Sequence, residues 1–228
     1  MPDAPSDSHG APSLRRRAYE QVTALLDEGR LRPGEIVSQR RLMEITGATL
    51  GAIREAVPRL EADGLLVTVP KKGLMVPSLD VSYVRNAYQV RRMIELSALP
   101  DMLTRIDAAE VSDWLDWHRS LVEEIEASGG IASTEQLGRL QARDWDMHSR
   151  FVSSMDNVLI DEIYRVTMIK IRMAVQSRLR VTGNNALRVI REHLAILEPL
   201  ARRDAEATAV ALERHIAISL ALALGASP

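Results

Sequence analysis

Residues 38–77 read SQRRLMEITGATLGAIREAVPRLEADGLLVTVPKKGLMVP, and this stretch decides the fold class of the first part of the chain. Ser38 is a good N-cap for a short helix, which Gly47 ends. Thr49 can cap a second helix, which runs to a stop at Gly64. The apolar residues of this second helix recur on one face: Ile53, Val57 and Leu60. The stretch therefore predicts two consecutive helices joined by a tight turn.

The hydrophobic period changes after the second helix. Residues 65–69 and 74–77 are short apolar runs, and the turn between them contains Gly73, which predicts a β-hairpin. An amphipathic helix over 14–29, followed by a type II turn at Pro33-Gly34, comes before the quoted stretch. Three helices and a hairpin in this order predict a winged helix–turn–helix over residues 14–77.

The sequence after Pro77 carries no strand signal. Residues 78–80 are expected to be a linker, and helical patterns fill residues 81–224. The six patterns occupy 81–99, 108–128, 134–154, 158–180, 185–203 and 205–224. We therefore expect a mostly α protein whose second domain is an antiparallel bundle of six or seven helices. Residues 1–13 are small, polar and interrupted by proline, which predicts a disordered tail.

Composition excludes several classes of protein. The 228 residues contain no cysteine, which excludes disulfides, thiolate metal sites and cysteine catalysis. Only 4% of the residues are aromatic, so a base-stacking platform for single strands is not expected. The longest apolar run, residues 216–225, is about half of a membrane span. With no targeting segment in the sequence, we expect a cytoplasmic protein that contacts no membrane.

A winged helix–turn–helix places the start of its second helix against base edges in the major groove of double-stranded DNA. Arginine offers guanine a bidentate fork, whereas lysine offers mainly charge. The candidate DNA-binding residues are Arg40, Arg41, Thr49, Arg54, Lys71 and Lys72. Residues 14–80 hold 11 basic and 9 acidic residues, so the placement of the charges, not their sum, carries the prediction. Each of these residues also has an ordinary interpretation without DNA. An arginine on a helix usually lies on a solvated face, and a threonine before a helix is usually only its N-cap.

The same residues resemble the GntR family of bacterial transcription regulators. The matching segments are LRPGE at 31–35, RRL at 40–42 and IREAVPRLEADGLL at 53–66. Gly73 matches the glycine of the family's wing, and the resemblance adds it to the expected DNA-binding residues. The resemblance implies a DNA-binding regulator, with repression as the expected mode, and not an enzyme.

Two residues depart from the family pattern. The family usually has Ser-Arg at the start of the recognition helix, where this chain has Thr49-Leu50. Leu50 cannot hydrogen-bond a base or a phosphate, although it can contact a thymine methyl group. Pro58 removes a backbone donor in mid-helix and clashes with the carbonyl of Arg54, which costs about 3 kcal/mol in an ordinary helix. We expect a kink or an early break of the helix at Pro58.

Three histidines and one aspartate in the second domain form a candidate metal site. Asp144 and His148 share one helix face, and His193 and His215 lie in two later helical segments. If they converge inside the bundle, they suit a divalent metal ion, with zinc first and nickel or manganese as alternatives. Each histidine alone is more often a surface or a satisfied core residue. His118 is interpreted as isolated.

The second domain resembles the FCD domain, the helical effector domain of the FadR subgroup of GntR regulators. The matching segments are VRRMIE at 90–95, DWDMHSRF at 144–151, EHLAIL at 192–197, RD at 203–204 and HI at 215–216. In many members one aspartate and three histidines hold a metal, and they correspond to Asp144, His148, His193 and His215. Family effectors are mostly small organic acids, for which Arg91 is the matching arginine and Arg172 a second candidate. For Arg91, an ion pair with Glu95 is an equally good interpretation.

These features together predict a regulator whose operator affinity is controlled by a small carboxylate effector at the metal site. A homodimer is expected because paired recognition helices must reach half-sites spaced by the DNA repeat. The alternatives are a metal-responsive regulator without an organic effector, a metal that only stabilises the bundle, and a metal-dependent hydrolase. Glu192 is the one base to consider for the hydrolase, but it is expected to point away from His193 on their helix.

Overall fold

The computed structural model describes residues 13–78, 80–178, 183 and 185–226. The chain divides into two compact units, residues 1–78 and 79–228. Of the tail expected over residues 1–13, all but Ser13 lies outside the described residues. The side chain of Ser13 accepts a hydrogen bond from the backbone N–H of Arg16 and caps the first helix.

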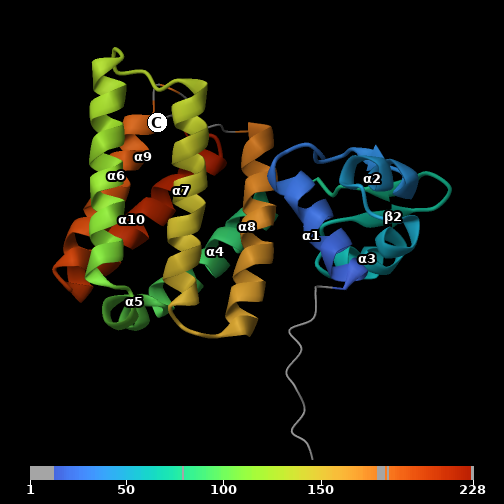
Figure 1. Cartoon of the computed structure of the whole chain (residues 1–228), viewed down its shortest axis with the longest axis horizontal. Helices are drawn as coiled ribbons and strands as arrows, with labels where there is room; N and C mark the ends of the chain where they lie inside the picture. The colour runs from blue at the N-terminus through green and yellow to red at the C-terminus, as the bar shows by residue number, and fades with distance from the viewer. Residues whose placement is uncertain (1–12, 79, 179–182, 184, 227–228) are drawn as a thin grey trace, which may run out of the picture. The chain divides into compact units, whose positions relative to one another are not determined.

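The first unit has the predicted winged helix–turn–helix architecture (Figure 1). Its described elements are α1 (Leu14–Asp27), β1 (Ile36–Val37), α2 (Gln39–Thr46), α3 (Leu50–Ala62), β2 (Val67–Val69) and β3 (Gly73–Met75). The strands form one antiparallel sheet in the order β1-β3-β2. β1 was not expected from the sequence, because a two-residue strand has no period of its own. Pairing of Val37 with Leu74 creates it.

Local signals place the elements of this unit. The backbone N–H of Glu35 donates to Arg32 at 3.0 Å across Pro33-Gly34, and Gly34 has a φ of +82°, as a type II turn requires. Ser38 caps α2 and Thr49 caps α3, each by accepting from a backbone N–H three residues later. The apolar faces of the three helices then meet in a core that includes Val22, Leu26, Leu42, Ile53 and Leu60.

A kink or an early break was expected at Pro58, and the early break is wrong, because α3 continues to Ala62. Pro58 and Arg54 are both exposed, so the carbonyl that loses its helical partner lies on the solvent side of the helix. Val57 and Leu60 are buried on the opposite face, where α3 packs against α1. Tertiary packing therefore outweighs the local cost of the proline.

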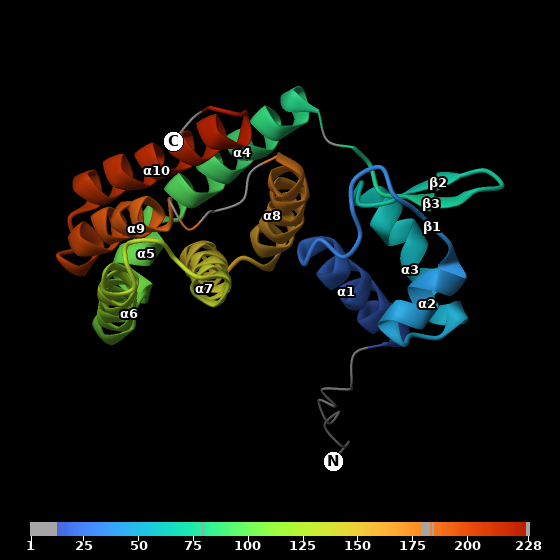
Figure 2. The same cartoon turned by 90° about the horizontal axis from the view of Figure 1, so that it is seen from above.

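The second unit is a helical bundle with no strand among its described residues, as predicted (Figure 2). Its helices are α4 (Val81–Ser97), α5 (Leu99–Arg105), α6 (Ala108–Ala127), α7 (Thr134–Ser153), α8 (Val158–Arg178), α9 (Ala186–Ala201) and α10 (Ala205–Ala223). α5 has no counterpart among the six predicted helices. Pro100 indicates the end of the helix predicted over 81–99, and the sequence predicts no further helix before residue 108. Proline is tolerated in the first turn of a helix, and Pro100 lies in the first turn of α5, one residue after its start at Leu99.

Helix packing in this unit brings distant segments together. α9 packs against both α6 and α10, and α10 lies alongside α4, as Figure 2 shows. The main core includes Phe151 of α7, Leu197 of α9 and Leu212 of α10, each fully buried. None of the helices in the described ranges is long and apolar enough to span a membrane.

Candidate metal centre and nucleic-acid interface

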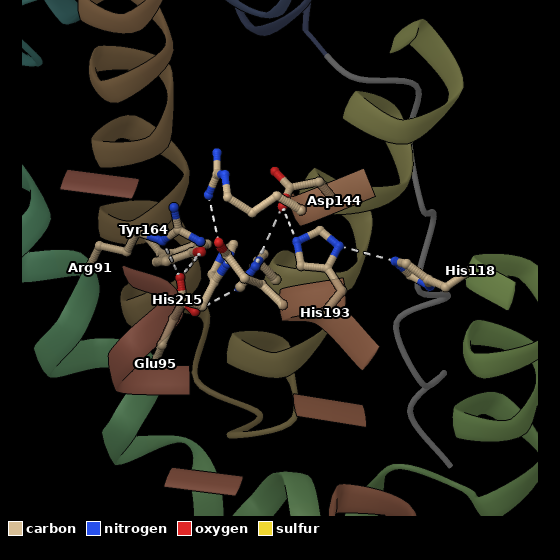
Figure 3. A network of polar contacts seen from close by, with 10 residues as sticks. Arg91, Glu95, His118, Asp144, Tyr164, His193 and His215 are labelled. Carbon is tan, nitrogen blue, oxygen red and sulfur yellow. Dashed lines mark hydrogen bonds and ion pairs between the residues drawn. The ribbon is translucent and has the colours of Figure 1, made fainter. Parts of the chain in front are cut away.

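Three helices of the second unit bring one aspartate and three histidines together (Figure 3). Asp144 and His148 lie one turn apart on α7, His193 comes from α9, and His215 comes from α10. One possible ligand atom from each residue lies within 4.8 Å of the others. The three imidazoles are buried. The four residues selected from the sequence therefore do converge in the fold.

The inner nitrogens of the three rings have no hydrogen-bond partner. The Nε2 atoms of His148, His193 and His215 are all buried and unsatisfied. His193 Nε2 lies 2.9 Å from Asp144 Oδ1, and His148 Nε2 lies 3.6 Å from the same oxygen. Buried polar atoms are normally satisfied, so orphaned nitrogens around one carboxylate show that these residues fit a cation. Three imidazoles and a carboxylate fit a divalent transition metal.

The outer nitrogen of each ring is held by a second residue. His148 Nδ1 lies 2.7 Å from Glu95 Oε2, and His215 Nδ1 lies 2.9 Å from Glu192 Oε2. An ionised carboxylate only accepts, so it keeps a proton on Nδ1 and leaves the lone pair of Nε2 for a metal. Glu192, which the sequence made the candidate base, contacts His215 of α10.

His118 holds the third ring, and its interpretation as isolated is wrong. His118 Nε2 lies 3.0 Å from His193 Nδ1. The two residues are 75 positions apart, so only the packing of α6 against α9 brings them into contact. No spacing rule within one helix would have found this pair.

Arg91 is the buried partner of Glu95. Arg91 Nε lies 2.6 Å from Glu95 Oε1, and the Tyr164 hydroxyl donates to the same oxygen at 2.6 Å. Burial would raise the pKa of Glu95, but Arg91 and His148 outweigh it and lower that pKa to about 2. The ion-pair interpretation of Arg91 thus describes its contact. Its Nη2 is nevertheless buried without a hydrogen-bond partner.

The second arginine candidate, Arg172, packs over an aromatic ring. Its Cζ lies 4.1 Å from the ring centroid of Trp145, the residue after Asp144. The contact places the guanidinium of an α8 residue against α7, the helix that supplies two of the candidate ligands.

The protonation states of the centre suit metal binding. Burial lowers the pKa of His118 and of His215 to about 4, so both rings are neutral at pH 7. Burial would raise the pKa of Asp144, but its contacts with His193 and His148 and the charge of Arg91 lower that pKa instead. Metals bind neutral imidazole and ionised carboxylate, so His215 and Asp144 need not lose protons to accept a cation near neutral pH.

The metal-free protein is expected to lose stability as the pH falls from 6.5 towards 4. His118 and His215 titrate at 6.5 when unfolded and at about 4 when folded, so the unfolded state binds more protons in this window. Each ring contributes a slope of up to about 1.4 kcal/mol per pH unit. Urea unfolding at pH 7, 6 and 5 in EDTA measures the effect, and a flat profile would contradict it.

The candidate DNA-binding residues are exposed on the first unit. Arg40 and Arg41 of α2 each lie 3.5 Å from the Glu44 carboxylate, and Arg54 Nε of α3 lies 3.4 Å from Gln39 Oε1. Lys71 and Lys72 lie in the turn between β2 and β3, and both are exposed. The arginines therefore sit on the helix pair and the lysines at the tip of the wing.

Gly73 and Thr49 have backbone functions in this unit. Gly73 has a φ of +122°, and a Cβ there would lie 2.9 Å from the carbonyl oxygen of Val37. Any other residue would push β3 away from β1, so Gly73 shapes the wing. Thr49 accepts from the N–H of Ala52 at 3.2 Å and caps α3.

Comparison with known proteins finds a matching family model for each of the two units. The model "Bacterial regulatory proteins, gntR family" matches residues 14–76, and the model "FCD domain" matches residues 86–218. "Probable HTH-type transcriptional regulator LgoR" of Escherichia coli K12 is 25% identical over 210 residues, which cover 90% of this chain and 66%, just under two thirds, of LgoR. The "Nta operon transcriptional regulator" of Aminobacter aminovorans is 28% identical over 186 residues, covering 81% and 82% of the two chains. The solved structure of E. coli McbR/YncC has the same fold, with a TM-score of 0.76 at 18% identity over 94% of this chain and 98% of that chain.

Proposed function

We propose that a small organic acid bound at a metal centre controls the affinity of this protein for operator DNA. The chain belongs to the GntR family of bacterial regulatory proteins and carries an FCD domain. The chain is a DNA-binding transcription regulator, and its relatives are described as regulators, not enzymes. The observation that carries the proposal is the convergence of Asp144, His148, His193 and His215 around unsatisfied nitrogens. In this proposal the protein is a cytoplasmic homodimer that represses until the acid binds.

The four converging residues would hold the metal, and zinc is the proposed ion, with nickel or manganese as alternatives. When bound, the metal would supply a Lewis-acidic position that a carboxylate of the effector could occupy. Glu95, Glu192 and His118 orient the three rings from outside, so the chain itself prepares the ligand set before any ion arrives.

Arg91 is proposed to bind the effector carboxylate. Its Nε is committed to Glu95, while its Nη2 is a buried donor without a partner. An incoming carboxylate would satisfy that donor with a charge-assisted hydrogen bond. Because Glu95 also holds His148, effector binding at Arg91 would be linked directly to the ligand set. Arg172 is the second candidate.

The first unit is proposed to read the operator with the two arginine positions of α2, with Arg54 of α3 and with the lysines of the wing. Leu50, at the first position of α3, is proposed to contact a thymine methyl group in place of a polar contact. Two recognition helices of a dimer would reach successive half-sites. The effector regulates binding only if it has different affinities for the DNA-bound and DNA-free arrangements of that dimer.

Binding of the purified protein to the DNA flanking its own gene tests this proposal. Fluorescence anisotropy with unrelated DNA as control should show sequence-dependent binding that weakens steeply with salt. Arg54→Ala should weaken binding to the operator by about 1–3 kcal/mol. Arg119→Ala, an exposed arginine of the second unit, should leave it unchanged. Binding no tighter than to unrelated DNA would overturn the proposal.

The same assay separates the effector proposal from its alternatives. With zinc present, a panel of small mono- and dicarboxylic acids should include one that releases the DNA. Release by zinc alone would favour a metal-responsive regulator without an organic effector. A metal that raises thermal stability but changes DNA binding under no condition would have only a structural function.

A further inference from the structure

His118 lies outside the four proposed ligands, yet it contacts one of them through a buried hydrogen bond. We propose that His118 is a positioning residue, which holds His193 in the tautomer whose Nε2 can bind the metal. This inference rests on the metal centre of the proposed function. It does not require His118 itself to touch the metal or the effector.

The contacts of His118 form a chain that ends at the centre (Figure 3). The ring is fully buried on α6, and its Nδ1 lies 2.7 Å from the carbonyl oxygen of Trp114, one turn earlier on the helix. Its Nε2 lies 3.0 Å from His193 Nδ1. The two rings meet edge to face, with centroids 5.2 Å apart and planes at 83°. The ring of Trp117, the preceding residue, also meets that of His118 edge to face.

The Trp114 carbonyl sets the direction of every hydrogen bond in this chain. A carbonyl oxygen only accepts, so Nδ1 of His118 must carry the proton. In the neutral ring, Nε2 of His118 then has the lone pair and can only accept. His193 must therefore donate from Nδ1, which leaves its own Nε2 as a lone pair beside Asp144. One backbone carbonyl thus selects the metal-binding form of a side chain two hydrogen bonds away.

His193 is held by a neutral histidine, whereas the rings of His148 and His215 are held by negatively charged carboxylates. Glu95 is paired with Arg91 and Glu192 with Arg188, so both pairs are neutral overall. Among these five groups Asp144 then leaves one negative charge, and a divalent ion would bring their sum to one positive charge. A third carboxylate in place of His118 would cancel it. His118 therefore orients His193 while preserving the charge that would attract an effector carboxylate.

Two substitutions at His118 test the positioning function. His118→Leu removes the acceptor, and His118→Gln offers an amide oxygen in its place. Nitrogen-15 NMR of the metal-free full-length protein reports which nitrogen of His193 carries the proton. We expect the proton on Nδ1 in the wild type and in His118→Gln, and a substantial Nε2-protonated population in His118→Leu.

Zinc affinity gives the second readout, measured by competition with a chromophoric chelator. His118→Leu should bind zinc 10–100-fold more weakly, as loss of an outer-shell partner typically does, and His118→Gln should recover most of the loss. Leu121→Ala is the matched control, because it opens a cavity one turn along α6 at another fully buried side chain. It should lower stability and leave zinc affinity unchanged.

Three results would overturn the proposal. One is an unchanged zinc affinity and an unchanged His193 tautomer in His118→Leu. Another is an equal loss of zinc affinity in Leu121→Ala, which would give His118 only a packing function. The third is a proton on Nε2 of His193 in the wild type, which decides the matter even if His118→Leu does not fold. If the wild type binds no zinc, the metal centre fails, but the NMR result still tests the action of His118 on His193.

Discussion

Glu95→Ala is expected to destabilise the second unit by about 3–5 kcal/mol, the usual cost of removing one partner of a buried ion pair. Glu95 is fully buried and accepts from Arg91, Tyr164 and His148. Its removal leaves the Arg91 charge buried without a counter-charge and deprives the Tyr164 hydroxyl and His148 Nδ1 of their acceptor. The free energy of unfolding, measured by urea denaturation of the metal-free protein, gives the size of the loss.

Glu213→Ala is the matched control for this prediction. Glu213 pairs with Arg92, the neighbour of Arg91 on α4, but both side chains of that pair are about half exposed. An exposed pair of this kind contributes at most about 1 kcal/mol. If both variants lose the same free energy of unfolding, burial does not increase the contribution of the Arg91–Glu95 pair to stability, and the prediction is wrong.

His215→Ala is expected to weaken zinc binding at least about 100-fold, because loss of a ligand exceeds the 10–100-fold cost of losing an outer partner. Removal of His215 leaves its outer partner Glu192 in an ion pair with Arg188. Zinc at about 1,000 times the wild-type dissociation constant should stabilise the wild type by about 4 kcal/mol. The variant should gain about 1.4 kcal/mol or less at that concentration.

Thermal unfolding with and without zinc, together with chelator competition, checks this prediction. Arg214→Ala, at the exposed neighbouring position on α10, is the control and should bind zinc as the wild type does. An unchanged zinc affinity in His215→Ala would mean that the ion binds elsewhere, and the proposed centre would be wrong.

Local sequence signals predicted most of the fold of this chain. The Ser38 and Thr49 caps and the Pro33-Gly34 turn each depend on backbone groups no more than three residues away, and the structure contains all three. The helices of the second unit follow the apolar period closely, as α6 does at Ala108–Ala127 against the predicted 108–128. Such signals are readable because each bond closes within one turn of chain.

Features that depend on packing were missed or mistaken. β1 exists only because Val37 pairs with Leu74, and α3 passes through Pro58 because its opposite face packs on α1. The candidate ligands were selected because Asp144 and His148 share a helix face and because the chain resembles the FCD domain. Their convergence with His193 and His215 had to come from the packing of α7, α9 and α10.

The sequence by itself determined which side chains can bind a metal, since ligand chemistry belongs to the residue types of Asp144, His148, His193 and His215. Only the tertiary structure decided which nitrogen of each ring is available. The deciding partners are Glu95, His118 and Glu192, which lie 53, 75 and 23 residues from the rings that they hold. A ring's tautomer follows the hydrogen bond at its other nitrogen, and that bond forms only when separate helices pack together.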